Sequence, residues 1–274
     1  MAIQVSYSDD PARVLTEARA FLASEPVLHN IILTLLHARV AHPEPGRYWV
    51  ATNGEAVVGL IFQSPLNFAA TLTPMQPEVV VAMVERIADA AIALPGVNGD
   101  AATAARFAGQ WTERTKSAAV PFLGLRLYEL VESGERSAAR GRLRQGVPSD
   151  RELVIDWVRR FQTEIGEQYS EPDAFVDQWL PAGHLWIWDD GEPVSMAVTR
   201  RQVEKVVRVA GVFTPNEKRN RGYAGACVYD LSNQIRDNGH RAILYTDLGN
   251  PTSNSIYRRI GYRAVAEGLR YRFE

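Results

Sequence analysis

The feature that most constrains the fold is residues 212–224, where an apolar segment leads into a short basic turn and then into a helical pattern. Apolar and small side chains recur at helical spacing after the turn: Ala224, Cys227, Val228, Leu231 and Ile235. Such periodicity favours an amphipathic helix. The segment therefore predicts a strand, a turn and a helix in immediate succession.

The start of this predicted helix is suited to bind a phosphate or a pyrophosphate. Its first N–H groups have no partners within the helix, and the helix dipole adds partial positive charge there. Gly222 allows a ligand to approach closely because it has no Cβ atom, and Arg219 and Arg221 add positive charge. The turn has neither the lysine–serine pair of the P-loop nor the three glycines of the dinucleotide fingerprint. Taken alone, it therefore also fits a plain surface turn.

A second segment, residues 244–262, supports the interpretation of the first. It reads as a strand followed by a short helix that ends in a glycine. The order Arg-x-x-Gly-x-Ala from Arg219 resembles the coenzyme A pyrophosphate loop of the GCN5-related N-acetyltransferases, the GNAT family. The Asn-x-x-Tyr order at Asn254 and Tyr257, followed by a Gly-Tyr pair, resembles the segment that comes after this loop in the same family.

The resemblance covers residues 149–274 well and the first half of the chain in outline. It implies an α/β fold with two GNAT-like domains in tandem, each a mixed, mostly antiparallel central sheet flanked by helices. We expect a degenerate GNAT-like domain without the coenzyme A loop at residues 1–132. A charged, glycine-containing linker at residues 133–149 and a catalytic GNAT domain at residues 150–274 follow in this interpretation.

Both halves show the same order of predicted elements. In the first half we expect helices at about 11–23 and 26–40, strands at 47–52, 56–64 and 68–73, helices at about 77–93 and 100–116, and a strand near 122–131. In the second half we expect helices at about 150–165 and 171–180, strands at 184–188, 193–200 and 206–214, a helix at about 222–238, a strand at 242–247, a helix near 252–260, and strands toward the C-terminus. An Asn53-Gly54 turn joins the first two strands, as expected for a hairpin.

Identities between the halves favour an internal duplication. At one constant offset, Trp49, Gly54, Glu55 and Val57 fall opposite Trp186, Gly191, Glu192 and Val194, and at a nearby offset Thr73-Pro74 falls opposite Thr214-Pro215. After Pro74, however, the chain has no arginine or glycine, and Glu78 stands at the helix start, which would repel a phosphate. The first half is expected to complete the fold or an interface, or to wall off an acceptor pocket.

The resemblance also assigns coenzyme contacts. In the GNAT family two adjacent parallel strands splay apart and the pantetheine arm lies between them; the corresponding strands here are 206–214 and 242–247. Main-chain groups of Val212, Phe213 and Thr214 would hold the arm, and one N–H would stabilise the oxyanion. The loop implied to bind the pyrophosphate consists of Arg219, Asn220, Arg221, Gly222, Tyr223, Ala224 and Gly225.

Catalytic roles follow from the same resemblance. Tyr257 is implied as the general acid that protonates the departing thiolate, and Asn254, on the same helix face, as a ligand of the pantetheine amide. Without the family, Tyr257 also fits a packed helix aromatic. Candidates for the general base are Glu164, Glu167 and Glu171, or a carbonyl-held water.

Composition excludes several classes of function. A net charge of -2 and a pI near 6.3 argue against a general nucleic-acid or anionic-membrane binder. Cys227 is the single cysteine, so no disulfide forms within the chain, and the five histidines show no metal-ligand spacing. We expect no metal. The chain has no leader-like or bilayer-spanning segment, which predicts a soluble, cytoplasmic protein.

The sequence thus predicts an N-acetyltransferase that moves an acetyl group directly from acetyl-CoA to a primary amine of a small molecule, as a monomer or a homodimer. Four aromatic residues are expected either to line the acceptor pocket or to pack in the core: Tyr169, Phe175, Trp179 and Trp186. The alternative is a non-catalytic acyl-CoA-binding sensor. A nucleic-acid-binding module that uses the basic turn would instead show affinity that falls steeply with salt.

Overall fold

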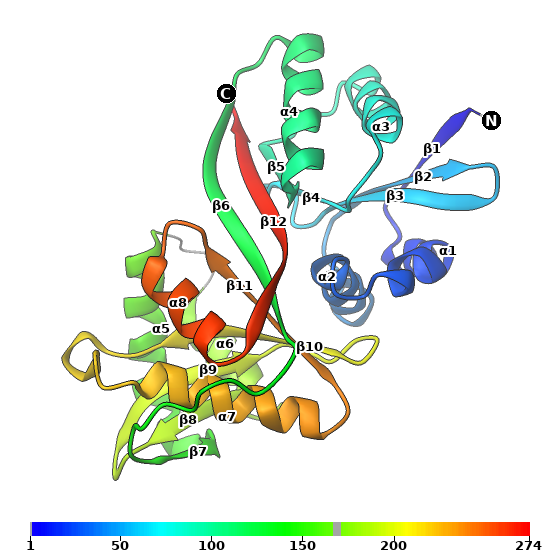
Figure 1. Ribbon diagram of the computed structural model, residues 1–274. Coiled ribbons are helices and arrows are strands. Elements are labelled where there is room, and N and C mark those ends of the chain that lie inside the picture. The colour runs from blue at the N-terminus through cyan, green and yellow to red at the C-terminus, as the bar shows by residue number, and fades with distance from the viewer. Residues whose placement is uncertain (1, 167–170) are drawn as a thin grey trace. The chain divides into compact units, whose positions relative to one another are not determined.

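The computed structural model describes residues 2–166 and 171–274, which form two compact units (Figure 1). The first unit comprises the chain up to Leu127, Thr246–Asn250 and Val265–Glu274. The second comprises Tyr128–Tyr245 and Pro251–Ala264. The two units are therefore not consecutive halves of the chain, because the end of the last strand belongs to the first unit.

The first unit contains an α/β arrangement with one mixed sheet. Its elements are β1 (Ile3–Ser8), α1 (Pro11–Ser24), α2 (Asn30–Ala41), β2 (Arg47–Asn53), β3 (Ala56–Gln63), β4 (Ala70–Leu72), α3 (Pro77–Asp89), β5 (Gly96–Asp100), α4 (Ala101–Thr115) and most of β6 (Ala119–Leu130). Strands β1 to β5 lie in sequence order in the sheet, and β12 (Tyr262–Phe273) follows β5. Among the described pairings of β1 to β5 and β12, β4 and β5 are parallel and the others are antiparallel.

The second unit repeats this order of elements. It contains β7 (Arg142–Gln145), α5 (Arg151–Ile165), α6 (Pro172–Trp179), β8 (Leu185–Asp189), β9 (Pro193–Thr199), β10 (Val206–Phe213), α7 (Tyr223–Asp237), most of β11 (Arg241–Asp247) and α8 (Pro251–Arg259). Single 3-10 turns occur at Pro148–Asp150 and Asn216–Lys218. The sheet order is β11-β10-β9-β8-β7, and β10 with β11 is its parallel pair.

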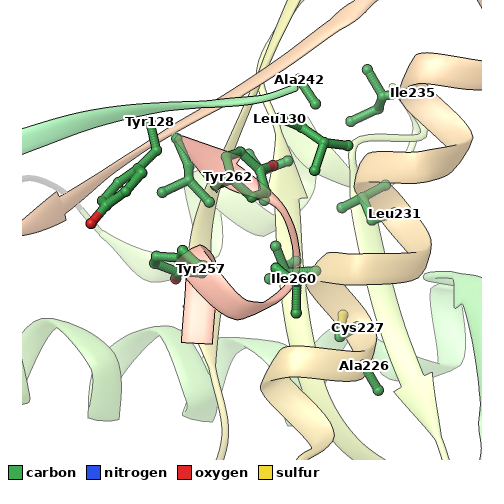
Figure 2. Packing of buried hydrophobic residues seen from close by; sticks show 14 of the residues in the cluster. Tyr128, Leu130, Ala226, Cys227, Leu231, Ile235, Ala242, Tyr257, Ile260 and Tyr262 are labelled. Atoms are coloured by element: carbon green, nitrogen blue, oxygen red, sulfur yellow. The ribbon is translucent and has the colours of Figure 1, made fainter. Parts of the chain in front are cut away.

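Alternation along the strands of the second unit builds a core on each face of its sheet. Trp186 and Trp188 of β8 pack on the side of α7, whereas Leu185 and Ile187 pack on the side of α5 and α6. Figure 2 shows part of the first cluster, to which α7 contributes Cys227 and α8 contributes Tyr257. The Cys227 thiol is fully buried and burial raises its pKa, which is typical of a packed, unreactive thiol.

The α/β fold class, with two GNAT-like units of mixed sheet and flanking helices, agrees with the sequence prediction. The Asn53-Gly54 hairpin is confirmed, since Asn53 pairs with Ala56 and Gly54 adopts a left-handed conformation. Three strands, β1, β5 and β7, were not predicted. β5 reads Gly-Val-Asn-Gly-Asp, a composition poor in strand-forming residues, and it becomes a strand because β4 and β12 pair with it on both sides.

The compact units also differ from the expected domain boundaries. Residues 133–149, expected to be a linker, contain β7, which pairs with β8 at the edge of the second sheet. Residues 150–274, expected to be one domain, end in a strand whose part from Val265 pairs with β5. Pairing between strands that are distant in sequence leaves no local signal, so hydrophobic periodicity could not place these segments.

Candidate functional site

The parallel pair β10–β11 opens part of the way along its length. Its register runs from Val206 opposite Arg241 to Val209 opposite Leu244. β10 continues beyond this point to Phe213, so its last residues extend past the described pairing with β11. The expected splayed pair of strands is therefore a feature of the described second unit.

On its other side, β10 carries a bulge against β9. The register shifts between Ala210 and Phe213, which places Gly211 and Val212 in the irregular stretch, and Gly211 adopts a left-handed φ of +57°. In the described part of this unit, these two residues have no register partner on β9 or on β11. Their backbone N–H and C=O groups are thus candidates for pairing with an extended ligand.

The end of β10 is held by buried side chains of β9. The Ser195 hydroxyl donates to the Phe213 carbonyl at 3.0 Å and lies 2.8 Å from the Thr214 hydroxyl. All three residues are buried. This contact anchors the end of β10 to β9, beyond the described pairing of β10 with β11.

The helix that follows, α7, begins without a side-chain cap. Gly222 is its N-cap residue, with a left-handed φ of +80°, and the first helical bond runs from the Ala226 N–H to the Gly222 carbonyl at 3.0 Å. Among the residues that the structure describes, the N–H groups of Tyr223, Ala224 and Gly225 find no acceptor. Three N–H groups at a helix N-terminus form a site that attracts an anion.

A segment that sequence analysis took for linker lies over this helix start. A Cβ atom on Gly222 would approach the Ser137 hydroxyl oxygen to 2.3 Å. Arg136 donates to both carboxylate oxygens of Asp230 on α7, at 2.8 Å. The Glu135 N–H donates to the carbonyl of Arg259, the last residue of α8, at 2.9 Å. Ser137 thus adds a hydroxyl beside the uncapped N–H groups. No local sequence motif predicts this position of Ser137.

The basic residues of the loop have different partners. Arg219 donates to both carboxylate oxygens of Glu164, at 2.8 and 2.6 Å, and to the Thr214 carbonyl at 2.9 Å. Arg221 is exposed and, within the described ranges, pairs with no carboxylate. Arg219 therefore ties the end of β10 to α5, while the Arg221 guanidinium is available to a phosphate.

The Tyr257 hydroxyl belongs to a largely buried side chain of α8 in the cluster of Figure 2. Burial, and secondarily the neighbouring Cys227, raise the pKa of Tyr257 to about 12. Its ring packs edge-on against Tyr262 and tilted against Tyr128. The phenol is therefore protonated at neutral pH, as a proton donor must be.

Asn254, one turn before Tyr257, is also buried. The Tyr128 hydroxyl donates to the Asn254 Oδ1 atom at 3.0 Å, which orients the side-chain amide. Tyr128 was not predicted to belong to the site, since it lies far from Asn254 in sequence and carries no motif. Asn254, which was predicted to share a helix face with Tyr257, thus has a buried hydrogen-bonding partner in Tyr128.

The proposed general bases lie in different environments. Glu164 forms an ion pair with Arg219. Glu171 is exposed before α6, and Glu167, like Tyr169, lies outside the described residues. Across residues 2–166 and 171–274 there is no cluster of side chains that could hold a metal ion. No helix in these ranges is long and apolar enough to cross a membrane.

Comparison with known proteins agrees with this geometry. Residues 190–271 match the family described as FR47-like protein. Among proteins of curated function, none matches the sequence. Solved structures with a similar fold include a GCN5-related N-acetyltransferase from Sphaerobacter thermophilus, with 14% identity, a TM-score of 0.63, and coverage of 98% of this chain and 95% of that one.

Two further structures are similar over nearly their whole length. One is a GNAT-family acetyltransferase from Colwellia psychrerythraea, with 10% identity, a TM-score of 0.62 and full coverage of both chains. The other is a tandem GNAT protein of the clavulanic acid biosynthesis pathway, with 9% identity, a TM-score of 0.59 and 98% coverage of each chain. These likenesses show that the chain has the tandem GNAT fold.

Proposed function

We propose that this protein transfers an acetyl group from acetyl-CoA to a primary amine of a small molecule, in the second unit, without an acyl-enzyme. The GNAT fold supports acyl transfer in general. The observation that carries the finer proposal is the combination of the opened β10–β11 pair with the uncapped start of α7. A thioester arm fits the first feature and a pyrophosphate fits the second.

The residues present fit the coenzyme. The N–H groups of Tyr223, Ala224 and Gly225, with Arg221 and Ser137, would hold the pyrophosphate. The backbone of residues 211–214 would pair with the pantetheine arm. Gly222 is required because a side chain there would collide with the Ser137 hydroxyl, and because its φ of +80° favours glycine.

In the chemical step, the amine nitrogen attacks the thioester carbonyl carbon, a C–N bond forms, and the C–S bond breaks. A backbone N–H near Val212 would stabilise the negative charge on the carbonyl oxygen, by a few kcal/mol in comparable sites. Tyr257 would donate its proton to the departing sulfur, since a phenol is protonated at neutral pH. The ammonium proton leaves to a carboxylate or to water; Glu164, one candidate base, is paired with Arg219.

Calorimetric titration with acetyl-CoA tests the coenzyme site. We expect a dissociation constant near the micromolar range, about 8 kcal/mol of binding free energy, and loss of binding in Gly222→Glu. Gly239→Glu is a matched control, because Gly239 also has a left-handed φ, of +79°, but has no neighbour near its missing Cβ and lies beyond the end of α7. Absence of binding by the natural protein, or equal binding by Gly222→Glu, would overturn the proposal.

A non-catalytic acyl-CoA sensor is the second candidate, favoured by one observation. Glu164, a candidate general base, accepts two hydrogen bonds from Arg219, as a residue with a structural role would. Substitution of Tyr257 by phenylalanine separates the two functions: an enzyme should lose about 100-fold in thiol release with an amine, while acetyl-CoA affinity is retained. A sensor would release no thiol with any amine, and unchanged turnover in Tyr257→Phe would remove Tyr257 from the mechanism.

A further inference from the structure

Two arginines stand side by side on one face of the second unit's sheet. Arg208 of β10 and Arg200, directly after β9, are cross-strand neighbours, because the Arg200 N–H donates to the Arg208 carbonyl at 2.8 Å and Val209 pairs with Thr199. Residues opposite each other in an antiparallel pair project to the same side. That side is the one where Val198 of β9 packs with α5 and α6.

Like charges placed directly opposite each other weaken a sheet. Both side chains are half-buried, and burial lowers the pKa of each. For Arg208, burial and then the charge of Arg200 lower the pKa to about 10, which still leaves the guanidinium charged at neutral pH. The unit therefore places two partly desolvated guanidinium groups next to each other.

Two more hydrogen-bond donors adjoin the arginines. The Arg200 guanidinium lies over the Trp179 ring, 5.5 Å from its centroid, and the Trp179 indole N–H is buried without an acceptor among the described residues. Tyr245 of β11 interacts electrostatically with Arg208, and burial raises its pKa to about 12, so its phenol is protonated. An indole N–H and a guanidinium can only donate hydrogen bonds.

An acidic partner for Arg200 is absent from the described ranges: no Asp or Glu carboxylate there lies within ion-pair distance of its guanidinium. A buried donor without an acceptor, next to a cation without a described counter-ion, is an unfavourable arrangement that a bound anion would correct. The cluster of Arg200, Arg208, Trp179 and Tyr245, here called the donor cluster, thus has the composition of an anion site.

The donor cluster lies close to the expected point of acetyl transfer. Arg208 directly precedes Val209, where the pairing of β10 with β11 ends, and Gly211 of the bulge is three residues from Arg208. At the rise of an extended strand, three residues span about 10 Å. A small acceptor could therefore place its amine at the bulge and an anionic group within reach of the arginine side chains.

We propose that the donor cluster binds an anionic oxygen group of the acceptor, a carboxylate or a phosphate, so that the preferred substrates are anionic amines. The proposal rests on the proposed acetyl transfer and specifies its substrate class. Paired guanidinium groups bind carboxylates and phosphates by parallel charge-assisted hydrogen bonds. Polycationic amines would be repelled by the same residues.

The test measures thiol release from acetyl-CoA with matched amines: glycine and glycinamide, 4-aminobutyrate and 4-aminobutyramide, and phosphoethanolamine and ethanolamine. The first two pairs report on carboxylates and the third on phosphate. In at least one pair we expect kcat/KM to be at least about tenfold higher for the anionic member. In Arg200→Gln and Arg208→Gln this ratio should fall toward one, mainly through KM, whereas the control Arg201→Gln, at an exposed neighbour, should keep it.

A second readout does not depend on turnover. Inorganic phosphate should raise the thermal unfolding midpoint of the natural protein and of Arg201→Gln more than that of Arg200→Gln or Arg208→Gln. If acetyl-CoA binds and neutral amines react equally well in all variants, the donor cluster has no role in acceptor choice and acetyl transfer stands. If acetyl-CoA does not bind, the proposed function fails. If no amine reacts, equal phosphate effects in all four proteins overturn the anion site.

Discussion

The parallel strand pairs of the two units, β4–β5 and β10–β11, occupy the same place in the repeated order of elements but end differently. In the first unit, all three residues of β4 pair with β5, up to Leu72 opposite Gly99. Gly99 allows this closure, since a Cβ there would lie 2.7 Å from the Leu72 carbonyl oxygen. In the second unit, pairing stops at Val209 while β10 continues.

The helices that follow these strands, α3 and α7, differ in how their N-termini would attract an anion. α3 begins at Pro77, which has no N–H group, and Glu78 in its first turn is negative. α7 begins after Gly222 with three N–H groups for which the described chain offers no acceptor. A repeated fold has therefore kept its helices and strands in both units, while a strand opening and an anion-attracting helix start occur together in the second unit.

The strongest test of this contrast is amide hydrogen exchange with and without coenzyme A. At concentrations about 1,000 times the dissociation constant, we expect protection of residues 211–214 and 223–225 to rise by up to about a thousandfold. Residues 70–73 and 77–80 should be unchanged. Gly222→Glu serves as the control without protection, and equal protection of both regions would remove the distinction between the units.

The first helices of the two units offer a second contrast. α1 is capped by the exposed Asp10, whereas Asp150, before α5, is buried and receives two hydrogen bonds from Arg144. Burial, the largest single effect, raises the pKa of Asp150, but the Arg144 hydrogen bond, the Val147 N–H hydrogen bond and the Arg144 charge together outweigh it and hold the pKa below its usual value. We expect Asp150→Asn to lower the free energy of unfolding by about 3 kcal/mol, and Asp10→Asn by less than about 0.5 kcal/mol.

Urea titration measures both effects and their pH dependence. Because the Asp150 pKa is lower in the folded protein, its contribution is complete above the unfolded pKa of about 4 and is lost as the pH falls through the folded value. The difference between the natural protein and Asp150→Asn should therefore be full at neutral pH and shrink below about pH 4. A difference that persists unchanged in acid would show that the charge of Asp150 is not its source.

The smallest expected effect concerns Ser137, which lies beside the start of α7. Loss of one hydroxyl from the phosphate site should raise the KM for acetyl-CoA about fivefold, or about 1 kcal/mol. Ser133→Ala is the matched control, because Ser133 lies in the same segment but bonds to Asn233 farther along α7. A KM that falls in Ser137→Ala would mean that the hydroxyl obstructs the coenzyme instead of binding it.

Much of the fold could be predicted because its signals are local. The helical period after Gly222 and the Asn53-Gly54 turn depend on neighbouring residues, and both appear in the structure as expected. β5 and β7 were missed because their strand character comes from partners far away in the sequence. The same limit applies to Ser137, which reaches Gly222 only through tertiary packing.

The candidate site likewise has features that a local motif indicated and features that depend on distant contacts. The motif at Arg219 to Ala224 indicated a phosphate loop but could not show that Arg219 pairs with Glu164, because the two residues lie on separate elements. The proximity of Arg200 and Arg208 depends on strand register, and a register shift of one residue would place them on opposite faces. A linear pattern could therefore not reveal the proposed anion site of Arg200 and Arg208.

By itself, the sequence determined the order of elements, the resemblance to GNAT acetyltransferases and the contrast between a glycine-bearing loop and its acidic counterpart, since each depends on residues within one turn or one strand. Only the tertiary structure decided where β10 leaves β11, which partner each arginine has, and which unit the last strand completes. These features arise from backbone hydrogen bonds and ion pairs between distant segments, and such pairings exist only once the chain has folded.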